Sequence, residues 1–255
     1  MKRMYICNDN VNGVLSGIYD AWIFGRNEGD SGILLRGQME QELFCEYIET
    51  VETPEKAAAV ERMIRKNLGE EAYLDIYQAL LAHDKDKGSA ILGTIQAARK
   101  IPDSTKIMNH LSHKWVEKVF ELSRQVGGEA HQFKGFVRFK ELESGVLFAQ
   151  IEPKNQILTC IADHFSDRLP LENFMVHDRT HEMFLVHQAH KRWVLVWGEQ
   201  IDTDKLDKVS EAQLEYEYLW KGFCKSISIK ERENARLQKQ NLPLRYRQDI
   251  VEFQQ

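Results

Sequence analysis

Three acid–base side chains stand in the second half of the sequence, where the apolar pattern changes from helical to strand-like: His131, Glu152 and Asp178. Paired carboxylates can act as general acid and base, and imidazole titrates near neutral pH. We consider these three residues as candidate catalytic groups, with a plain strand exit at Glu152-Pro153 as the alternative. Because the sequence has no phosphate-binding glycine loop, no Gly-x-Ser-x-Gly and no Cys–His nucleophile pattern, it leaves open whether the protein is an enzyme.

A second set of side chains suits contact with phosphate. Residues 221–247 contain eight basic and two acidic residues, a charge of +6, whereas the 255-residue chain carries −5, so the other 228 residues carry −11. An acidic body with one basic segment favours contact with a polyanion, because each neutralised phosphate releases counterions. A merely solvated basic face is the alternative. The residues that we predict to contact nucleic acid are Lys134, Arg138, Arg232, Arg236, Lys239, Arg245, Tyr246 and Arg247.

The local pattern places these residues on two elements. Ser228, three residues before Glu231, forms a capping-box pattern and predicts a helix as far as Pro243. Three cations would share one face of that helix: Arg232, Arg236 and Lys239. Residues 135–140 are β-rich and predict a strand, on which Lys134, Phe136 and Arg138 would share a face.

Aromatic side chains accompany the basic segment. Tyr246 stands between two arginines, so we expect it to stack on a base. Stacking is also possible in principle for the others, but their helical spacing favours a place in the core for most of them. These other residues are Tyr216, Tyr218, Trp220, Phe223 and Phe253. The core-like spacing is clearest at Phe223 and at the aliphatic Leu219.

Cysteine and histidine spacing argues against a metal centre. The four cysteines are Cys7, Cys45, Cys160 and Cys224. No Cys-x-x-Cys occurs, so we expect no disulfide, no cluster and no cofactor. The histidines with suggestive spacing are His110, His113, His177, His181, His187 and His190. They lack a His-Glu-x-x-His pattern, and we expect no metal there either.

Apolar spacing in the first half predicts helices with clear boundaries, preceded by a short strand at 5–7. Thr53-Pro54 predicts a helix start, with a hydroxyl cap and a proline that needs no amide partner. Four glycines within 25–37 predict a loop. The expected helices run from Val11 to that loop, from Pro54 to Gly69, over 70–82 and 89–100, and from Asp103 or Ser104 to Gly127-Gly128.

The second half predicts strands, and the whole sequence an α+β fold with one domain over 1–255. Its sub-regions are 1–128, mainly helical, 129–200, which holds the sheet, and 201–255, helical and basic. The fold expected for residues 131–200 is an antiparallel sheet with an inserted helix. The expected strands are 135–140, 146–151, 174–177, 183–187 and 193–197, with a hairpin connection at 141–145 and helices at 155–165 and 205–226.

The sequence predicts no membrane span, since its longest charge-free runs have 10 residues. The basic first residues resemble the start of a signal peptide, but the polar Asn8-Asp9-Asn10 follows at once and leaves no room for an apolar region. We therefore expect a cytoplasmic protein.

Several strings of the sequence together resemble one known family. They are HQFKGFVRF at 131–139, IEP at 151–153, ADHFSDR at 162–168, IKERENARLQ at 229–238 and LPLRYR at 242–247. The chain resembles the bacterial "probable DNA metabolism protein" family over its whole length. Members of that family are encoded beside a radical-SAM iron–sulfur protein, and some are fused to a uracil-DNA-glycosylase-like domain.

The resemblance implies a role in DNA repair or modification and carries over no catalytic residue. We expect an accessory protein that binds DNA, a radical-SAM iron–sulfur partner, or both. One alternative is an enzyme that cleaves a glycosidic or phosphodiester bond of DNA, and another is a protein–protein adaptor without nucleic-acid contact.

Overall fold

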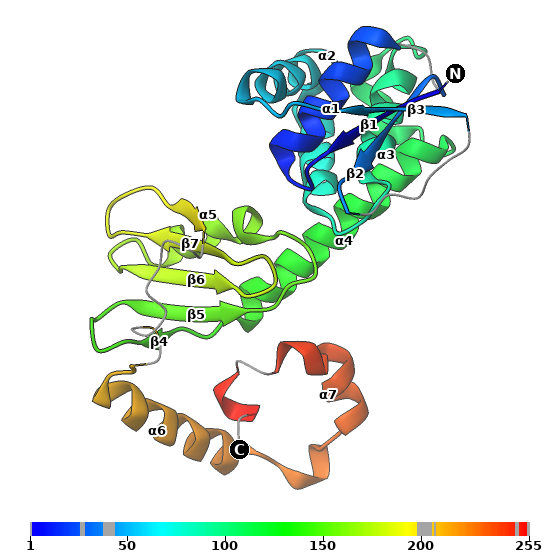
Figure 1. Cartoon of the computed structure of the whole chain (residues 1–255). Helices are drawn as coiled ribbons and strands as arrows, with labels where there is room; N and C mark the ends of the chain where they lie inside the picture. The colour runs from blue at the N-terminus through cyan, green and yellow to red at the C-terminus, as the bar shows by residue number, and fades with distance from the viewer. Residues whose placement is uncertain are drawn as a thin grey trace. The chain divides into compact units, whose positions relative to one another are not determined.

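A computed structural model describes residues 2–25, 29–37, 44–197, 206, 208–247 and 250–253 of the chain (Figure 1). The chain divides into two compact units, unit 1 (Met1–Gly128) and unit 2 (Glu129–Gln255). This boundary coincides with the predicted end of the helical sub-region at 128. The single domain expected from the sequence stays a prediction, and each unit is described by itself.

Unit 1 contains a three-stranded parallel sheet. The central strand β1 (Lys2–Cys7) pairs with β2 (Ser31–Leu35) on one side and β3 (Cys45–Glu49) on the other. The predicted strand at 5–7 is confirmed. The loop expected over 25–37 is wrong at its centre, because the turns at Gly29 and Gly37, both with positive φ, enclose β2. Pairing with a distant strand stabilises such a short segment, and local composition does not reveal it.

The helices of unit 1 are α1 (Val11–Phe24), α2 (Pro54–Leu81), α3 (Lys87–Ala98), the 3₁₀ helix η1 (Ser104–Asn109) and the first part of α4 (Lys114–Phe136). Helices α1, α2 and α3 follow the predicted boundaries closely, and α4 does not. Thr53 caps α2 by accepting a hydrogen bond from the Lys56 N–H at 3.2 Å, as predicted. Gly69, with φ 87° and ψ 170°, interrupts α2 where the sequence predicts the end of one helix.

Helix α4 corrects three predictions. Asp103 caps the short η1 rather than a long helix, and α4 begins only at Lys114. It then continues through Gly127-Gly128, the expected stop, to Phe136. The buried residues of α4 keep helical spacing across the glycines: Val119, Leu122, Val126, Ala130 and Phe133. Burial of this stripe outweighs the cost of about 1 kcal/mol for each glycine in a helix.

The expected strand over 135–140 is therefore wrong. Only β4 (Lys140–Glu141) is extended there, and Lys134 and Phe136 lie in the last turns of α4. Arg138 follows the helix end. These residues consequently do not share the face of a strand.

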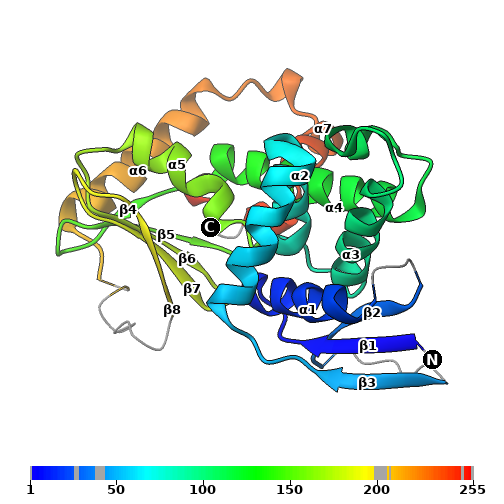
Figure 2. The ribbon, with the colours of Figure 1, turned by 90° about the horizontal axis from the view of Figure 1, so that it is seen from above.

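Unit 2 contains a five-stranded sheet in the order β4-β5-β6-β7-β8, which Figure 2 shows in succession. The strands after β4 are β5 (Leu147–Ile151), β6 (Phe174–Asp178), β7 (Met183–His187) and β8 (Val194–Trp197). The hairpin at 141–145 is confirmed by the antiparallel pairing of β4 and β5. The sheet is mixed rather than antiparallel throughout, since β5 and β6 run parallel. The crossover between them contains α5 (Leu158–Arg168), as a parallel connection requires.

The C-terminal region is helical, as predicted, but differently divided. Its elements are α6 (Glu211–Ile227), η4 (Lys230–Arg232), α7 (Ala235–Asn241), η5 (Leu244–Tyr246) and η6 (Val251–Phe253). The capping box at Ser228 is wrong, because Ser228 ends α6 and Asn234 caps α7 through the Leu237 N–H at 3.0 Å. Arg232 thus lies outside the helix of Arg236 and Lys239. The start of the helix expected at 205–226 falls partly outside the described residues.

The α+β class is confirmed by the parallel sheet with helices, the mixed sheet and the C-terminal helices. Among the helices that the structure describes, none is both long and apolar enough to cross a membrane.

A substitution at Gly93 tests how closely α3 packs against Trp115 in unit 1. A Cβ atom at Gly93 of α3 would lie 2.2 Å from Cδ1 of Trp115, so a neighbour must shift. We expect Gly93→Ala to lower the free energy of unfolding by about 1–3 kcal/mol in urea denaturation followed by circular dichroism. Gly128→Ala is the control, because a Cβ there meets no described atom within 4 Å. We expect the control to be neutral or slightly stabilising, and an equal loss in both variants would contradict this packing.

Candidate nucleic-acid interface

Half of the residues predicted to contact nucleic acid bond within unit 2. The Arg138 guanidinium pairs with Glu252 at 3.3 Å and donates to the Gly135 carbonyl at 2.9 Å. Arg245 pairs with the carboxylate of Glu129 at 3.4 Å. The remaining two are Tyr246 and Arg247, which also point into the unit. The three arginines and Tyr246 therefore form contacts that stabilise unit 2.

Tyr246 is only 5% exposed. Its ring packs edge-on against Phe133, with centroids 4.9 Å apart, and against Phe136 at 5.3 Å. Its hydroxyl donates to Gln132, and burial raises its pKa above the ordinary value. The ring is covered by its neighbours, so this arrangement does not fit the stacking role expected from the sequence.

Arg247 fastens the same segment. Its Nε donates to the Leu242 carbonyl at 3.0 Å, and its guanidinium lies 4.6 Å from the ring centroid of Phe253. Together, Tyr246 and the two arginines beside it attach the C-terminal residues to one another and to α4.

The other cations of the basic segment face solvent. These exposed residues are Lys221, Lys225, Arg232, Arg236 and Lys239. Within the part of the chain that the structure describes, none of them forms an ion pair. On α7, Arg236 and Lys239 lie three positions apart and so on one side of the helix. Lys134 is half-buried on α4, where its charge adds to burial in lowering the pKa of His164.

Helix α6 exposes aromatic rings that the sequence predicts to be buried in the core. None of its residues is buried. Tyr216 is 68% exposed, Tyr218 79% and Trp220 44%, and Phe223 is exposed as well. Helical spacing alone predicts burial for such residues, and that prediction is wrong here.

The sheet brings Glu152 and Asp178 to one edge. Because β5 and β6 are parallel and Ile151 pairs with Asp178, both acids stand where their strands end. Arg179 lies with them and pairs with Glu152 at 3.0 Å. Asp178 is 1% exposed. His131, by contrast, lies on the exposed side of α4, and no contact with either acid occurs among the described residues.

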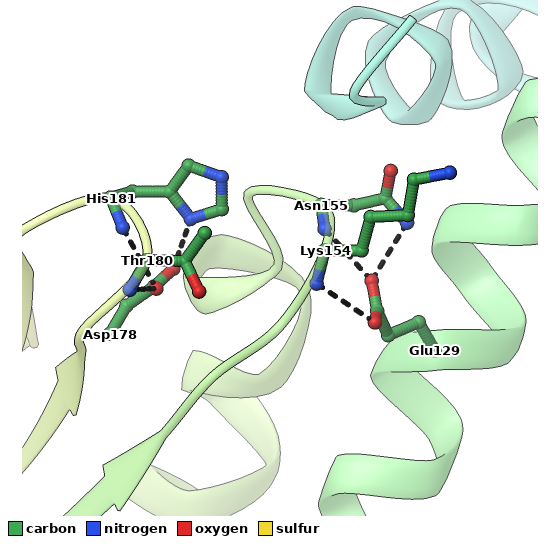
Figure 3. A network of polar contacts seen from close by, with 6 residues as sticks. All are labelled: Glu129, Lys154, Asn155, Asp178, Thr180 and His181. Carbon is green, nitrogen blue, oxygen red and sulfur yellow. Dashed lines mark hydrogen bonds and ion pairs between the residues drawn. The ribbon is translucent and has the colours of Figure 1, made fainter. Parts of the chain in front are cut away.

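Asp178 positions His181, whose spacing in the sequence suggests no role other than metal binding. One carboxylate oxygen accepts the N–H groups of Thr180 and His181 at 3.0 and 3.2 Å, and the other contacts Nδ1 of His181 at 2.7 Å (Figure 3). The second ring nitrogen of His181 points away from Asp178 in Figure 3. A buried carboxylate that fixes an imidazole in this way can support general-base chemistry. The same geometry also simply closes the turn after β6.

Glu129 is the residue that sequence reasoning missed. Its buried carboxylate accepts the backbone N–H groups of Lys154 and Asn155 at 3.0 and 2.9 Å and the Asn155 amide at 2.7 Å (Figure 3). It also receives Arg245. The sequence does contain a signal for a buried Glu129. It lies three residues after Val126 and so on the apolar side of α4, where an acidic residue is unusual.

The cysteines are all free thiols. Burial raises the pKa of the Cys7 thiol to about 12 and raises that of Cys160 as well, so both stay protonated and weakly nucleophilic at neutral pH. Among the residues with described positions, no three histidine, cysteine or acidic side chains are placed to hold a metal ion.

The chain belongs to the DUF4130 family, a domain of unknown function, whose family model matches residues 85–252. The matched segment covers more than half of the chain, from the loop before α3 to η6. It includes all the residues of the candidate interface. A search of curated proteins finds no match.

Glu129 should be among the most sensitive side chains of unit 2. Glu129→Gln replaces one of the two accepting oxygens with an NH₂ group, which cannot accept the N–H groups that face it. It also removes the negative charge that pairs with Arg245. We expect a loss of about 1–3 kcal/mol in the free energy of unfolding, measured in urea at pH 7. Glu143→Gln, at an exposed acid of the same unit, should change it by less than about 0.5 kcal/mol. Equal effects would show that the buried network is unimportant.

Proposed function

We propose that the protein is an accessory factor of DNA repair or modification that binds DNA and a radical-SAM iron–sulfur partner. The observation that carries the proposal is the row of exposed cations along α6, η4 and α7, which have no acidic partner among the described residues. The remaining 228 residues carry −11. Phosphate would therefore be attracted to this segment and repelled by the rest of the chain.

The family resemblance supplies the DNA context and the partner. A partner that carries the iron–sulfur cluster leaves this chain to contribute binding and positioning. Cys7 and Cys160 support this division of roles, since burial raises the pKa of both thiols and a protonated cysteine is a poor cluster ligand.

Removing two outward cations should weaken DNA binding by an electrostatic mechanism. We expect the double variant Arg236→Ala/Lys239→Ala to lower DNA affinity and to reduce the slope of log K against log salt by up to about 0.9 per lost contact on duplex DNA. Fluorescence anisotropy of a labelled oligonucleotide at several salt concentrations measures both quantities. The double variant Arg62→Ala/Lys66→Ala removes the same charge from exposed positions on α2 and should leave the slope nearly unchanged.

An unchanged affinity and slope in a folded Arg236→Ala/Lys239→Ala variant would remove the phosphate contact from the proposal. Co-expression with the radical-SAM neighbour then separates the alternatives. An adaptor without nucleic-acid contact would still capture that partner while no DNA binds to this chain even at low salt.

The Asp178–His181 pair favours a second candidate, an enzyme that cleaves a glycosidic or phosphodiester bond of DNA. His181 would act as the proton acceptor, positioned by Asp178. Incubation of the pure chain with damaged and intact oligonucleotides, with and without divalent metal, should then yield product. We expect His181→Gln to abolish it and His190→Gln, at an exposed turn histidine, to retain it. Absence of product in every condition would exclude the enzyme and leave the accessory factor as the proposed function.

A further inference from the structure

An open cleft of about 420 Å³ in unit 2 lies beside α6. Its walls come from α6, η6 and the residues that follow α4. The lining groups that matter here are Arg138, Phe139, Tyr216, Glu217, Trp220 and Glu252. The cleft is large enough for one heterocyclic base and its sugar, and it combines flat rings with hydrogen-bonding groups.

The aromatic wall consists of rings on one side of α6. Tyr216 and Trp220 are four positions apart and therefore neighbours on the helix surface. Phe223 extends the same row, with its ring centroid 5.8 Å from that of Trp220. Exposed rings in a row expose apolar area to water, and a flat ligand that covers them gains stacking and burial together.

The polar wall can satisfy the edge of a base. Glu252 accepts a hydrogen bond from the Trp220 indole N–H at 3.2 Å and pairs with Arg138 at 3.3 Å. Glu217 accepts from the side-chain amide of Gln213 at 3.0 Å. Carboxylates accept amino and imino hydrogens of nucleobases, while a guanidinium donates to their carbonyl oxygens and ring nitrogens.

Two cations stand next to the aromatic row. Lys221 follows Trp220 directly, and Lys225 lies one turn further along α6, both of them exposed. A strand whose bases contact the rings would place its phosphates near these amines. Aromatic stacking surfaces beside a cationic track are the usual means of binding single-stranded nucleic acid.

We propose that the row formed by Tyr216, Trp220 and Phe223, together with its cleft, binds an unpaired nucleobase of single-stranded DNA, with Lys221 and Lys225 on the adjacent phosphates. This inference rests on the proposed DNA binding and adds the form of the substrate. A base that is stacked and paired in a duplex cannot enter the cleft, so the site distinguishes single strands and extrahelical bases from intact duplex.

The test uses the full chain and three labelled probes: a single strand, its duplex and an abasic single strand with the same number of phosphates. Anisotropy titrations give an affinity for each. We expect the base-containing single strand to bind about tenfold or more tightly than the abasic strand. Trp220→Ala and Tyr216→Ala should each remove much of that difference and leave the abasic affinity unchanged. Trp220→Phe, which keeps a ring, should retain most of it.

Tyr218→Ala is the matched control, because Tyr218 is the most exposed aromatic of α6 and does not line the cleft. It should leave all three affinities unchanged. Circular dichroism establishes folding, and Tyr216→Ala carries the test alone if Trp220→Ala fails to fold.

Three results would overturn the inference in distinguishable ways. Equal binding of abasic and base-containing strands, both weakened by Arg236→Ala/Lys239→Ala, would exclude base contact and leave DNA binding intact. No binding of any probe would remove the proposed function as well. If Trp220→Ala changes only the capture of the radical-SAM partner, the aromatic row is a protein-docking surface and the inference is wrong.

Discussion

The buried carboxylate of Glu129 is the constraint on which the organisation of unit 2 depends. It lies on α4 and takes up three N–H donors from Lys154 and Asn155, at the exit from β5, as well as the Arg245 guanidinium. A buried charge is tolerated only when it is paired and hydrogen-bonded, so these partners must stay in place together. One side chain thereby fixes the helix, the crossover and the C-terminal segment to one another.

This constraint also divides the basic segment into two functional parts. Arg245 and Arg247 lie on either side of the buried Tyr246 and are used internally. Arg236 and Lys239, on α7, form no ion pair with any residue whose position is described, and they keep their charge available to solvent. The net charge of the segment, obvious in the sequence, therefore overstates the number of cations available for phosphate.

Local signals in the sequence predicted the elements that local interactions stabilise. The Thr53 cap, the interruption at Gly69 and four strands of the mixed sheet follow from neighbouring residues. Strands β2 and β3 depend on pairing with β1, which is distant in sequence, and were missed. At the candidate site, the sequence supplied Asp178 and the outward cations. It could not supply Glu129 or the role of His181, because both depend on which loops the fold brings to a buried acid.

The charge of the whole chain gives a physical reason why the proposed phosphate-binding groups should lie on the C-terminal helices. The body carries −11 and repels a polyanion within a Debye length, about 8 Å at physiological ionic strength. The acidic residues Glu211, Glu215 and Glu217 at the start of α6 act in the same direction. They would keep the phosphates of a bound strand at the half of the helix that carries Lys221 and Lys225. An uncharged base is not repelled in this way and can still reach Tyr216 and Trp220.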